Sequence, residues 1–398
     1  MIYVFYFLAA VSIWFGIQSL RGGLRFVSYV KRETSKPLED FQPFVSVIAP
    51  TRGLEVGLRE NFEAILNQDY PTYEVLFVFD GADDPAAKVL DQLDKSKVST
   101  KIVIAGPATD CGQKVHNLRV AVAETNANAN VLAFVDTDAR PHPLWLRQLV
   151  APLANAELGL SSGYRWFVPK RGGFASRIRS VWNASIASAL GANQQKNFCW
   201  GGSTAIRRAV FEDLKIRERW LGSISDDFTL TKVVHEAGLP IHFTPNCLVA
   251  SVGDCSLGEL FSFTTRQIQI TRVYAPELWL PLLLGSALFT LVFFGGLVIS
   301  IISIATEAIP VFVIGFVLTI FLLGAIKSII RWRAVQILLH QYHKELRRDL
   351  LAHVFLWPVT QPLYLYNALV AAFSRRVRWR GITYELKSPH EAVIIGRD

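Results

Sequence analysis

Long apolar stretches without charge constrain this chain more than any other feature. Residues 1–20, 278–305 and 309–326 contain no charged side chain. A helix needs about 20 apolar residues to cross the hydrocarbon core of a bilayer. The stretches therefore predict three membrane-spanning helices and exclude a purely soluble protein. The composition agrees, since 51% of the residues are hydrophobic and the mean hydropathy is +0.29.

The first apolar stretch, residues 1–20, could be a cleaved signal peptide instead of a membrane-spanning helix. Against a signal peptide, no basic residue precedes its apolar part, and no clear cleavage site follows. Basic residues do follow it, among them Arg21, Arg25 and Arg32. By the positive-inside rule, this flank and the domain after it are expected in the cytoplasm. We expect an integral protein of a bacterial plasma membrane, or of a Golgi or ER membrane if the protein is eukaryotic.

A fourth apolar stretch, residues 351–374, contains Pro358 and Pro362 and is flanked by basic residues on both sides. A simple crossing would leave the basic residues 375–380 outside the membrane, against the positive-inside rule. The stretch is therefore expected either to cross the bilayer or to re-enter it, and both alternatives stay open.

The net charge of +8 does not by itself indicate a nucleic-acid-binding protein. The basic residues gather beside the apolar stretches, where they favour anionic lipid headgroups over nucleic acid. The four cysteines form no CxxC pair. Reduced thiols are therefore expected rather than a metal finger.

Between the first and second spans, short apolar strands alternate with helical stretches. Strands are expected near residues 44–49, 73–80, 101–105 and 131–135, and helices near 58–66, 85–93 and 114–124. This alternation predicts an α/β domain with a doubly wound, mostly parallel sheet. Ligands of such sheets bind beyond the carboxyl ends of the strands.

Two aspartates, Asp136 and Asp138, directly follow the apolar run Val131–Val135. Acidic pairs at such places are often only helix caps or solvated turns. At the end of a buried strand, however, carboxylate oxygens suit a hard divalent cation that shares its ligands with a substrate phosphate. We therefore expect Mg²⁺ or Mn²⁺ bound together with a nucleotide diphosphate.

Other polar groups follow the same pattern. Asp80 and Asp84 end the second strand, where they fit either nucleotide recognition or a polar turn in which Asp84 caps the next helix. Lys114 opens a helix, a favourable position for binding an anion. The loop Phe198–Thr204 combines aromatic residues, glycines and hydroxyls and is expected to contact a ligand. Ser225 precedes two acids, Asp226 and Asp227, one more than capping a helix requires.

Several of these motifs occur together, in order, in one known family. The chain resembles membrane-bound family 2-type glycosyltransferases with a GT-A fold, in particular the ceramide glucosyltransferase-like branch. The resemblance covers residues 1–275, and the ending Val377–Tyr384 resembles that of lipid-directed members. Its motifs are Pro50–Glu55, Gln68–Val75, Asp80–Pro85, Lys114–Leu118, Asp136–Asp138, Phe198–Ser203, Ser225–Asp227 and Gln269–Val273.

The resemblance implies a role for each matching residue. Asp227 would be the general base, with Asp226 beside it, and Asp136 and Asp138 would hold the metal. Gln269 and Arg272 would hold the diphosphate of the donor. The residues implied to bind the donor nucleotide are Pro50, Asp80, Asp84, Lys114 and Asp136.

The function expected from the resemblance is the inverting, metal-dependent transfer of a single hexose, glucose first, from a UDP-sugar to a membrane lipid. A ceramide-like acceptor is favoured, and diacylglycerol, a hopanoid or a polyprenyl phosphate stays open. Val273 stands where the family usually has tryptophan, which argues against a processive polysaccharide synthase. A non-catalytic nucleotide-sugar binding module is a further alternative, and a transporter is disfavoured because no span contains a buried charged pair.

The expected organisation follows from these patterns. The parts are an N-terminal transmembrane helix (1–22), a GT-A domain (42–255), an amphipathic interfacial helix (256–276), a transmembrane hairpin (277–330), a second amphipathic helix (331–350), a transmembrane or re-entrant segment (351–374) and a basic tail (375–398).

Overall fold

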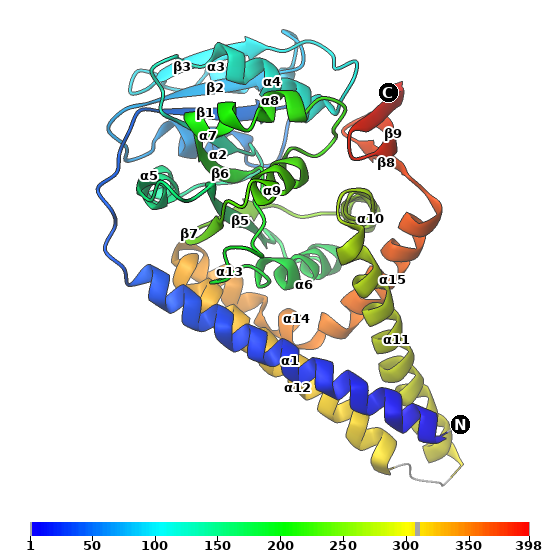
Figure 1. Cartoon of the computed structure of the whole chain (residues 1–398). Coiled ribbons are helices and arrows are strands. Elements are labelled where there is room, and N and C mark those ends of the chain that lie inside the picture. The colour runs from blue at the N-terminus through cyan, green and yellow to red at the C-terminus, as the bar shows by residue number, and fades with distance from the viewer. Residues whose placement is uncertain (1, 307–310, 398) are drawn as a thin grey trace. The chain divides into compact units, whose positions relative to one another are not determined.

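The computed structural model describes residues 2–306 and 311–397 (Figure 1). These residues form two compact units. One contains residues 30–170, 190–253 and 375–397, and the other contains residues 2–29, 171–189, 254–306 and 311–374. The turn of the expected hairpin includes residues 307–310, which lie outside the described residues.

The first unit is built on a seven-stranded sheet of order β3-β2-β1-β4-β6-β5-β7. The pairs β3–β2, β2–β1, β1–β4 and β5–β7 are parallel, whereas β6 is antiparallel to both of its neighbours. The mostly parallel α/β sheet expected from the sequence is thus confirmed. The strands are β1 (Val45–Thr51), β2 (Tyr73–Phe79), β3 (Ser99–Ile104), β4 (Val131–Val135), β5 (Leu160–Val168), β6 (Ser203–Arg207) and β7 (Ile241–Val252).

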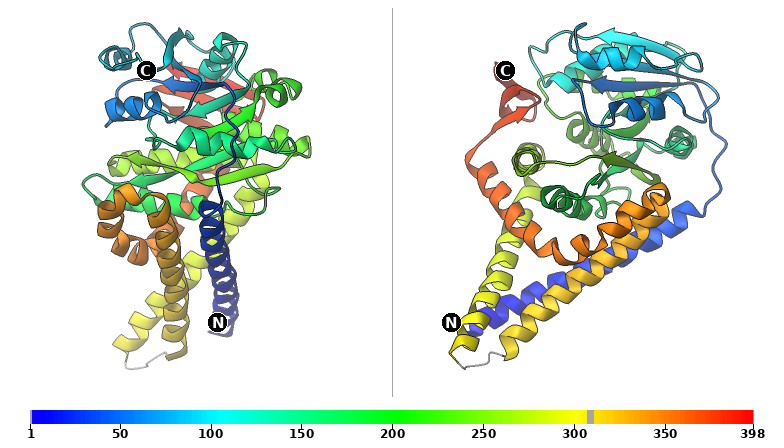
Figure 2. Two further views of the ribbon diagram at one scale, coloured as in Figure 1. Left: turned by 90° about the vertical axis from the view of Figure 1, so that its left-hand side faces the viewer. Right: turned by 180° about the vertical axis from the view of Figure 1, so that it is seen from behind.

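Helices cover both faces of this sheet (Figure 2). Leu76 and Val78 pack into an apolar cluster with residues of α4, α7, α8 and α9. Phe77 points the opposite way, because side chains alternate along a strand, and its ring lies 4.8 Å from that of Phe62 in α2. The helices of this unit are α2 (Leu58–Leu66), α3 (Pro85–Asp91), α4 (Gln113–Glu124), α5 (Trp145–Val150), α7 (Arg208–Asp213), α8 (Ile216–Arg219) and α9 (Asp226–Glu236), with a 3₁₀ turn at Ala151–Ala154.

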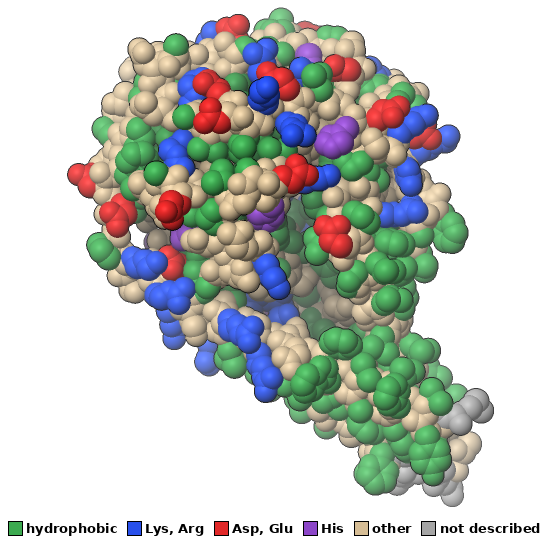
Figure 3. Space-filling model, in the orientation of Figure 1, with side chains coloured by type: hydrophobic (Ala, Val, Ile, Leu, Met, Phe, Trp, Pro, Cys, Tyr) green, Lys and Arg blue, Asp and Glu red, His purple; other side chains and the backbone are tan. Residues whose placement is uncertain are grey.

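The second unit is helical. Within the described ranges, three helices are long and apolar enough to cross a membrane, namely α1, α11 and α12. Hydrophobic side chains gather on the visible surface of these helices (Figure 3). Its helices are α1 (Ile2–Thr34, whose last turns belong to the other unit), α6 (Phe174–Ala187), α10 (Leu257–Tyr274), α11 (Pro276–Ala305), α12 (Val311–Leu338), α13 (His343–Arg348), α14 (Leu350–Phe355) and α15 (Trp357–Phe373), with a 3₁₀ turn at His340–Tyr342.

Local sequence explains the limits of α10. A capping box starts the helix, because the Ser256 hydroxyl accepts from the Glu259 backbone and the Glu259 carboxylate accepts from the Ser256 backbone. The helix ends before Pro276, since the residue that precedes a proline is disfavoured in helical conformation. Ala275 accordingly has φ −142° and ψ 65°.

Besides α1, which continues to Thr34 beyond its expected end at residue 22, three segments differ from the expected organisation. Residues 331–338 continue α12 instead of starting a separate amphipathic helix, since no glycine or proline lies between Lys327 and Leu338 to end the helix. Residues 171–189 lie within the range expected for the GT-A domain but belong to the helical unit, where Ile178 and Trp182 of α6 pack against residues of α10 and α15.

The third difference concerns the C-terminal segment, which forms a three-stranded antiparallel sheet where a basic tail is expected. Its strands are β8 (Arg376–Trp379), β9 (Ile382–Ser388) and β10 (Glu391–Arg397).

We expect Gly163→Ala to lower the free energy of unfolding by about 3 kcal/mol, as overpacking in a filled core does. A Cβ atom at this position in β5 would lie 1.9 Å from the Cys247 carbonyl oxygen. Thermal unfolding of the purified protein measures the effect. Gly191→Ala is the matched control, because its added Cβ meets no atom within 4 Å. Equal stability of the two variants would contradict the close approach of β5 and β7.

Candidate active site

The predicted acidic pair lies at the carboxyl end of β4, beside two cations. The Lys114 ammonium at the start of α4 is 2.7 Å from Asp136 Oδ1 and 3.2 Å from Asp226 Oδ2. Arg165 of β5 lies 3.6 Å from Asp136 Oδ2 and 3.1 Å from Asp138 Oδ2. Three carboxylates and two cations, far apart in the sequence, therefore form one charged cluster at the edge of the sheet.

The electrostatics of the cluster follow from its burial and its pairing. Burial disfavours the charge on Lys114, but the carboxylates of Asp136, Asp226 and Asp227 outweigh this and raise its pKa. Burial also opposes the charge on Asp136, yet Lys114 and Arg165 keep its pKa below the ordinary value. Lys114 is therefore a permanent cation and Asp136 a permanent anion at neutral pH.

Arg165 is a site residue that sequence reasoning missed. It is the one partly exposed residue of an otherwise buried strand, and its guanidinium lies 4.6 Å from the centre of the Trp200 ring. A cation over an aromatic face is attracted by the ring electrons. In the sequence, Arg165 stands out only as a single arginine among apolar and small residues. Its role as a partner of Asp136 and Asp138 becomes visible only in the folded structure.

Asp136 and Asp138 fit a divalent cation. Asp138 Oδ1 is buried and has no hydrogen-bond partner among the described residues, and a buried polar atom without a partner is costly. Carboxylate oxygens are the ligands that Mg²⁺ and Mn²⁺ prefer. The donor set and this unsatisfied oxygen together fit a divalent metal that these two aspartates would hold.

The two acids at the start of α9 have different surroundings. The Asp227 carboxylate accepts hydrogen bonds from the Ser225 hydroxyl and, at 2.8 Å, from the Phe228 backbone. Asp226 is buried and contacts Lys114. Burial is the main cause that raises the pKa of Asp226 to about 6; Lys114 opposes this rise, while Asp227 and Asp136 add to it.

Glycines of the loop before β6 permit the backbone to approach this cluster. A Cβ on Gly201 would lie 1.9 Å from Asp226 Oδ2, and a Cβ on Gly202 would lie 2.8 Å from Asp136 Oδ2. The loop predicted to contact a ligand thus lies directly against the acids, and only glycine fits at these two positions.

Asp80, at the end of β2, forms a second group of contacts. Its Oδ1 accepts a hydrogen bond from Asn117 Nδ2 at 2.7 Å, and its Oδ2 is 3.1 Å from the Arg52 guanidinium. Burial raises the pKa of Asp80, although Asn117 and Arg52 oppose the rise. Asn117 and Arg52 lie within the recognised motifs, but sequence reasoning gave them no role.

Asp84 caps a helix, which the sequence analysis offered as the alternative to nucleotide recognition. It accepts from the Ala86 backbone at 2.9 Å and so caps α3, and it also accepts from the Gly53 backbone. It therefore fixes the loop after β1. Pro50, within β1, accepts a hydrogen bond from the Thr137 hydroxyl at 3.3 Å. A direct contact of either residue with a nucleotide stays a prediction.

Gln269 and Arg272 belong to the helical unit. The Gln269 amide donates to the Ser374 carbonyl at 3.3 Å, and the Arg272 guanidinium donates to the Ala371 carbonyl. Arg272 also lies over the Trp279 ring, 5.3 Å from its centre. These contacts hold both side chains to helices of their own unit, and their expected role at the donor diphosphate stays a prediction.

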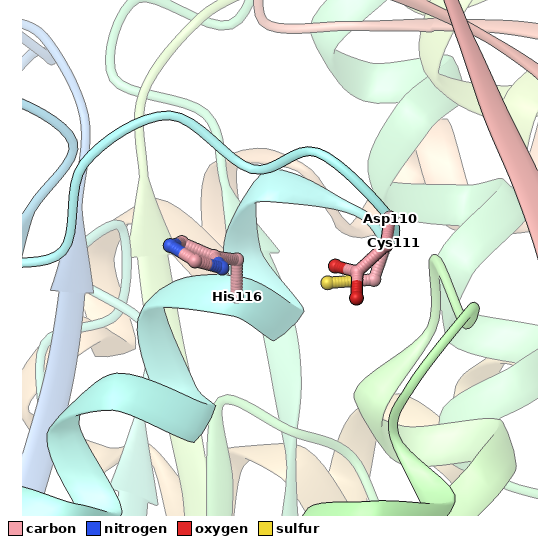
Figure 4. A group of neighbouring side chains, drawn as sticks. All are labelled: Asp110, Cys111 and His116. Carbon is pink, nitrogen blue, oxygen red and sulfur yellow. The ribbon is translucent and has the colours of Figure 1, made fainter.

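A second group of metal-ligand residue types, Asp110, Cys111 and His116, surrounds the start of α4 (Figure 4). Burial and the charge of Asp110 raise the pKa of the Cys111 thiol to about 12. His116 Nε2 is already engaged with the Ala105 carbonyl at 2.9 Å. We therefore interpret these three residues as part of the local structure around the start of α4, and not as a metal site. All four cysteines are free thiols, as expected.

Comparison with known proteins identifies the family. The model of glycosyl transferase family 21 matches residues 4–392, almost the whole chain.

The chain belongs to glycosyl transferase family 21.

This family 21 member is therefore a glycosyltransferase, and its predicted resemblance to the ceramide glucosyltransferase-like branch is confirmed. Among its relatives, ceramide glucosyltransferase 1 of Caenorhabditis elegans is 33% identical over 241 residues, which are 59% of this chain and 51% of the relative. Glycosyltransferase AglE of Haloferax volcanii is 26% identical over 60% of this chain and 80% of its own length. The chain thus spans most of AglE but about half of the ceramide glucosyltransferase.

Solved structures give weaker likenesses. The mannosyltransferase PcManGT of Pyrobaculum calidifontis, in complex with GDP-Man and Mn²⁺, is 17% identical with a TM-score of 0.48, over 92% of this chain and 99% of that one. Glucosyl-3-phosphoglycerate synthase of Mycobacterium tuberculosis has a TM-score of 0.36 at 17% identity, over 62% and 82% of the two chains. The family assignment does not depend on either.

We expect Asp226→Asn to change how stability depends on pH in the metal-free protein. With a raised pKa, the folded state holds the proton of this carboxyl group more tightly than the unfolded chain does. Its contribution to stability is therefore fully present below about pH 4 and is lost as the pH rises through about 6. Asparagine does not titrate, so the free energy of unfolding of the variant should rise relative to wild type over this window.

Thermal unfolding from about pH 4 to about pH 8 measures this difference. A difference that stays constant over the whole range would contradict the buried, titrating state of Asp226.

Proposed function

We propose that this glycosyltransferase transfers one hexose, glucose in the first place, from a UDP-sugar to the hydroxyl group of a membrane lipid, with inversion and with a divalent metal. A ceramide-like lipid is the favoured acceptor. The observation that carries the proposal is the cluster of Asp136, Asp138, Lys114 and Asp226 at the carboxyl edge of the sheet, in a chain of family 21.

The donor fits the polarity of the site. Lys114 and Arg165 supply positive charge beside Asp136, and a diphosphate requires such charge. Asp80 offers carboxylate oxygens that accept hydrogen bonds from the N–H and O–H groups of a base or ribose. Asp136 and Asp138 would hold Mg²⁺ or Mn²⁺, which neutralises the charge of a diphosphate leaving group when bound.

The acceptor oxygen attacks the anomeric carbon of the sugar, and the bond from that carbon to the UDP oxygen breaks. The leaving UDP takes the bonding electron pair, and the proton of the hydroxyl group moves to Asp227. Hydrogen bonds from Ser225 and Phe228 to Oδ1 of Asp227 orient its carboxylate. Positive charge on Lys114 stabilises the charge that grows on the diphosphate.

Asp226 is suited to a different task. It is more deeply buried than Asp227 and is paired with Lys114, so it holds the ammonium group in place. Because it is buried and paired with Lys114, its carboxylate is less accessible to an incoming lipid than that of the more exposed Asp227. The two acids thus divide the work, one on the donor side and one on the acceptor side.

The lipid acceptor is supported by the helical unit and by the relatives. Three helices have the length and apolar character of membrane spans, and two matched relatives are named ceramide glucosyltransferases. The basic residues after the first apolar stretch favour a cytoplasmic catalytic domain by the positive-inside rule. UDP-sugars would then reach the site from the cytoplasm.

The proposal predicts a lipid that gains one hexose. Purified protein in detergent is incubated with Mn²⁺ or Mg²⁺, a panel of UDP-sugars, and ceramide or diacylglycerol, and the lipids are analysed by mass spectrometry. We expect a product that is lost on EDTA treatment. Loss of a general base lowers the rate about 10²–10⁴-fold, so Asp227→Asn should do so while UDP binding remains.

Asp213→Asn is the matched control, because this exposed aspartate lies in α7 of the same unit, and its activity should equal that of wild type. UDP release without a lipid product would show that the proposed lipid is not the acceptor. No UDP release from any donor would favour a non-catalytic binding module. Full activity of Asp227→Asn would assign the base to another residue, with Asp226 as the next candidate.

A further inference from the structure

The C-terminal strands β8–β10 belong to the same compact unit as the seven-stranded sheet. Val377, Tyr384 and Leu386 form the buried face of this small sheet. Its place at the C-terminal end of the chain is visible in two views (Figures 1 and 2). Among its contacts with the rest of the unit, two lead to Asp80, one through the loop after β1 and one through the start of α4.

The first tie starts at the turn between β8 and β9. Arg380 has a left-handed backbone with φ 50°, followed by Gly381 with φ 73°, as the two-residue hairpin turn requires. In this conformation Arg380 donates to the Arg52 carbonyl at 2.8 Å and pairs with Glu55. The turn thereby holds the loop after β1, and the Arg52 guanidinium in turn contacts Asp80 Oδ2.

The second tie reaches the start of α4. The backbone N–H of Gln113 donates to the Tyr384 hydroxyl at 3.1 Å, and Arg397 donates to the Gln113 side-chain oxygen at 3.4 Å. The Gln113 amide donates to Asn117 Oδ1 at 2.9 Å. Asn117 then donates to Asp80 Oδ1. An unbroken chain of hydrogen bonds therefore links the C-terminal sheet to Asp80.

Both oxygens of Asp80 are thus held by residues that the C-terminal sheet holds. A carboxylate that recognises a base or ribose must have its oxygens fixed, because hydrogen bonds weaken steeply with angle and distance. Supporting groups that fix the orientation of a binding residue raise affinity without touching the ligand. The arrangement is specific, since two separate loops converge on one side chain.

We infer that the C-terminal sheet is a positioning element of the nucleotide site, which orients Asp80 through Arg380–Arg52 on one side and through Tyr384, Arg397, Gln113 and Asn117 on the other. The inference rests on the proposed nucleotide-binding role of Asp80. It gives the C-terminal segment, which in sequence resembles the ending of lipid-directed members, a role in binding the donor.

The test measures UDP affinity of the full-length protein in detergent by titration calorimetry, together with KM for the UDP-sugar and kcat. The double variant Arg380→Ala/Arg397→Ala should weaken UDP binding about tenfold or more, because two charged hydrogen-bonding groups are lost. KM for the donor should rise in parallel, whereas kcat should change little. Lys387→Ala is the matched control, since Lys387 is an exposed cation of the same sheet.

Tyr384→Phe tests the inference with a milder change, in case the double variant fails to fold. Phenylalanine keeps the buried ring and removes only the oxygen that accepts from Gln113, so UDP affinity should fall about threefold to tenfold while the melting temperature changes little. A lowered melting temperature with unchanged UDP affinity would mean a purely structural sheet and would overturn the inference.

Asp80→Asn separates this inference from the proposed function. If Asp80→Asn weakens UDP binding but the double variant and Tyr384→Phe bind like Lys387→Ala, the positioning role is overturned and the nucleotide role of Asp80 stands. If Asp80→Asn binds UDP as wild type does, the nucleotide role is overturned, and the inference with it.

Discussion

The ammonium group of Lys114 lies between the carboxylates of Asp136 and Asp226, and most of the candidate active site is arranged around this contact. Carboxylates taken out of water cost several kcal/mol unless a cation and hydrogen bonds compensate them. Without Lys114, the end of β4 and the start of α9 would bring together like charges. With it, the two acids can lie close to one another and to the glycine loop that covers them.

The same requirement explains Arg165. Lys114 is shared between Asp136 and Asp226, so its charge compensates each carboxylate only in part. Among the described residues, Arg165 is the one cation within ion-pair distance of Asp138. Arg165 lies within 4 Å of both aspartates. Charge pairing thus links β4, β5, α4 and α9, and it leaves one oxygen of Asp138 for a ligand.

The Asp80 side of the candidate site is built differently. Asp80 accepts a hydrogen bond from the Asn117 amide and forms an ion pair with Arg52. Asn117, through Gln113, and the Arg52 backbone are hydrogen-bonded to the C-terminal sheet. Under the proposed function, the charged cluster at the end of β4 would bind the diphosphate and metal, while Asp80 would present fixed oxygens to a neutral, polar group. This division suits a donor that carries charge at one end and a base at the other.

Regular local patterns made most of the α/β fold predictable. The strand at residues 131–135 and the helix at 58–66 have the predicted limits, because uninterrupted apolar runs and a 3.6-residue apolar period are properties of the segments themselves. The acids at strand ends were also predictable, since parallel strands place their carboxyl ends at one edge. Lys114, Asp226 and Asp227 were candidates from their positions at helix starts, and the family motifs implied their roles.

Arg165, the ties to Asp80 and the C-terminal sheet were decided only by the tertiary structure. Arg165 gains its role from carboxylates 27 and 29 residues before it, and Arg380 from a carbonyl 328 residues before it. No local pattern records such a pairing, because an ion pair depends on which strands become neighbours. The sequence alone determined which segments fold as strands, helices and apolar spans; the folded chain decided which charges meet, since compensation of a buried charge requires contact within a few ångströms.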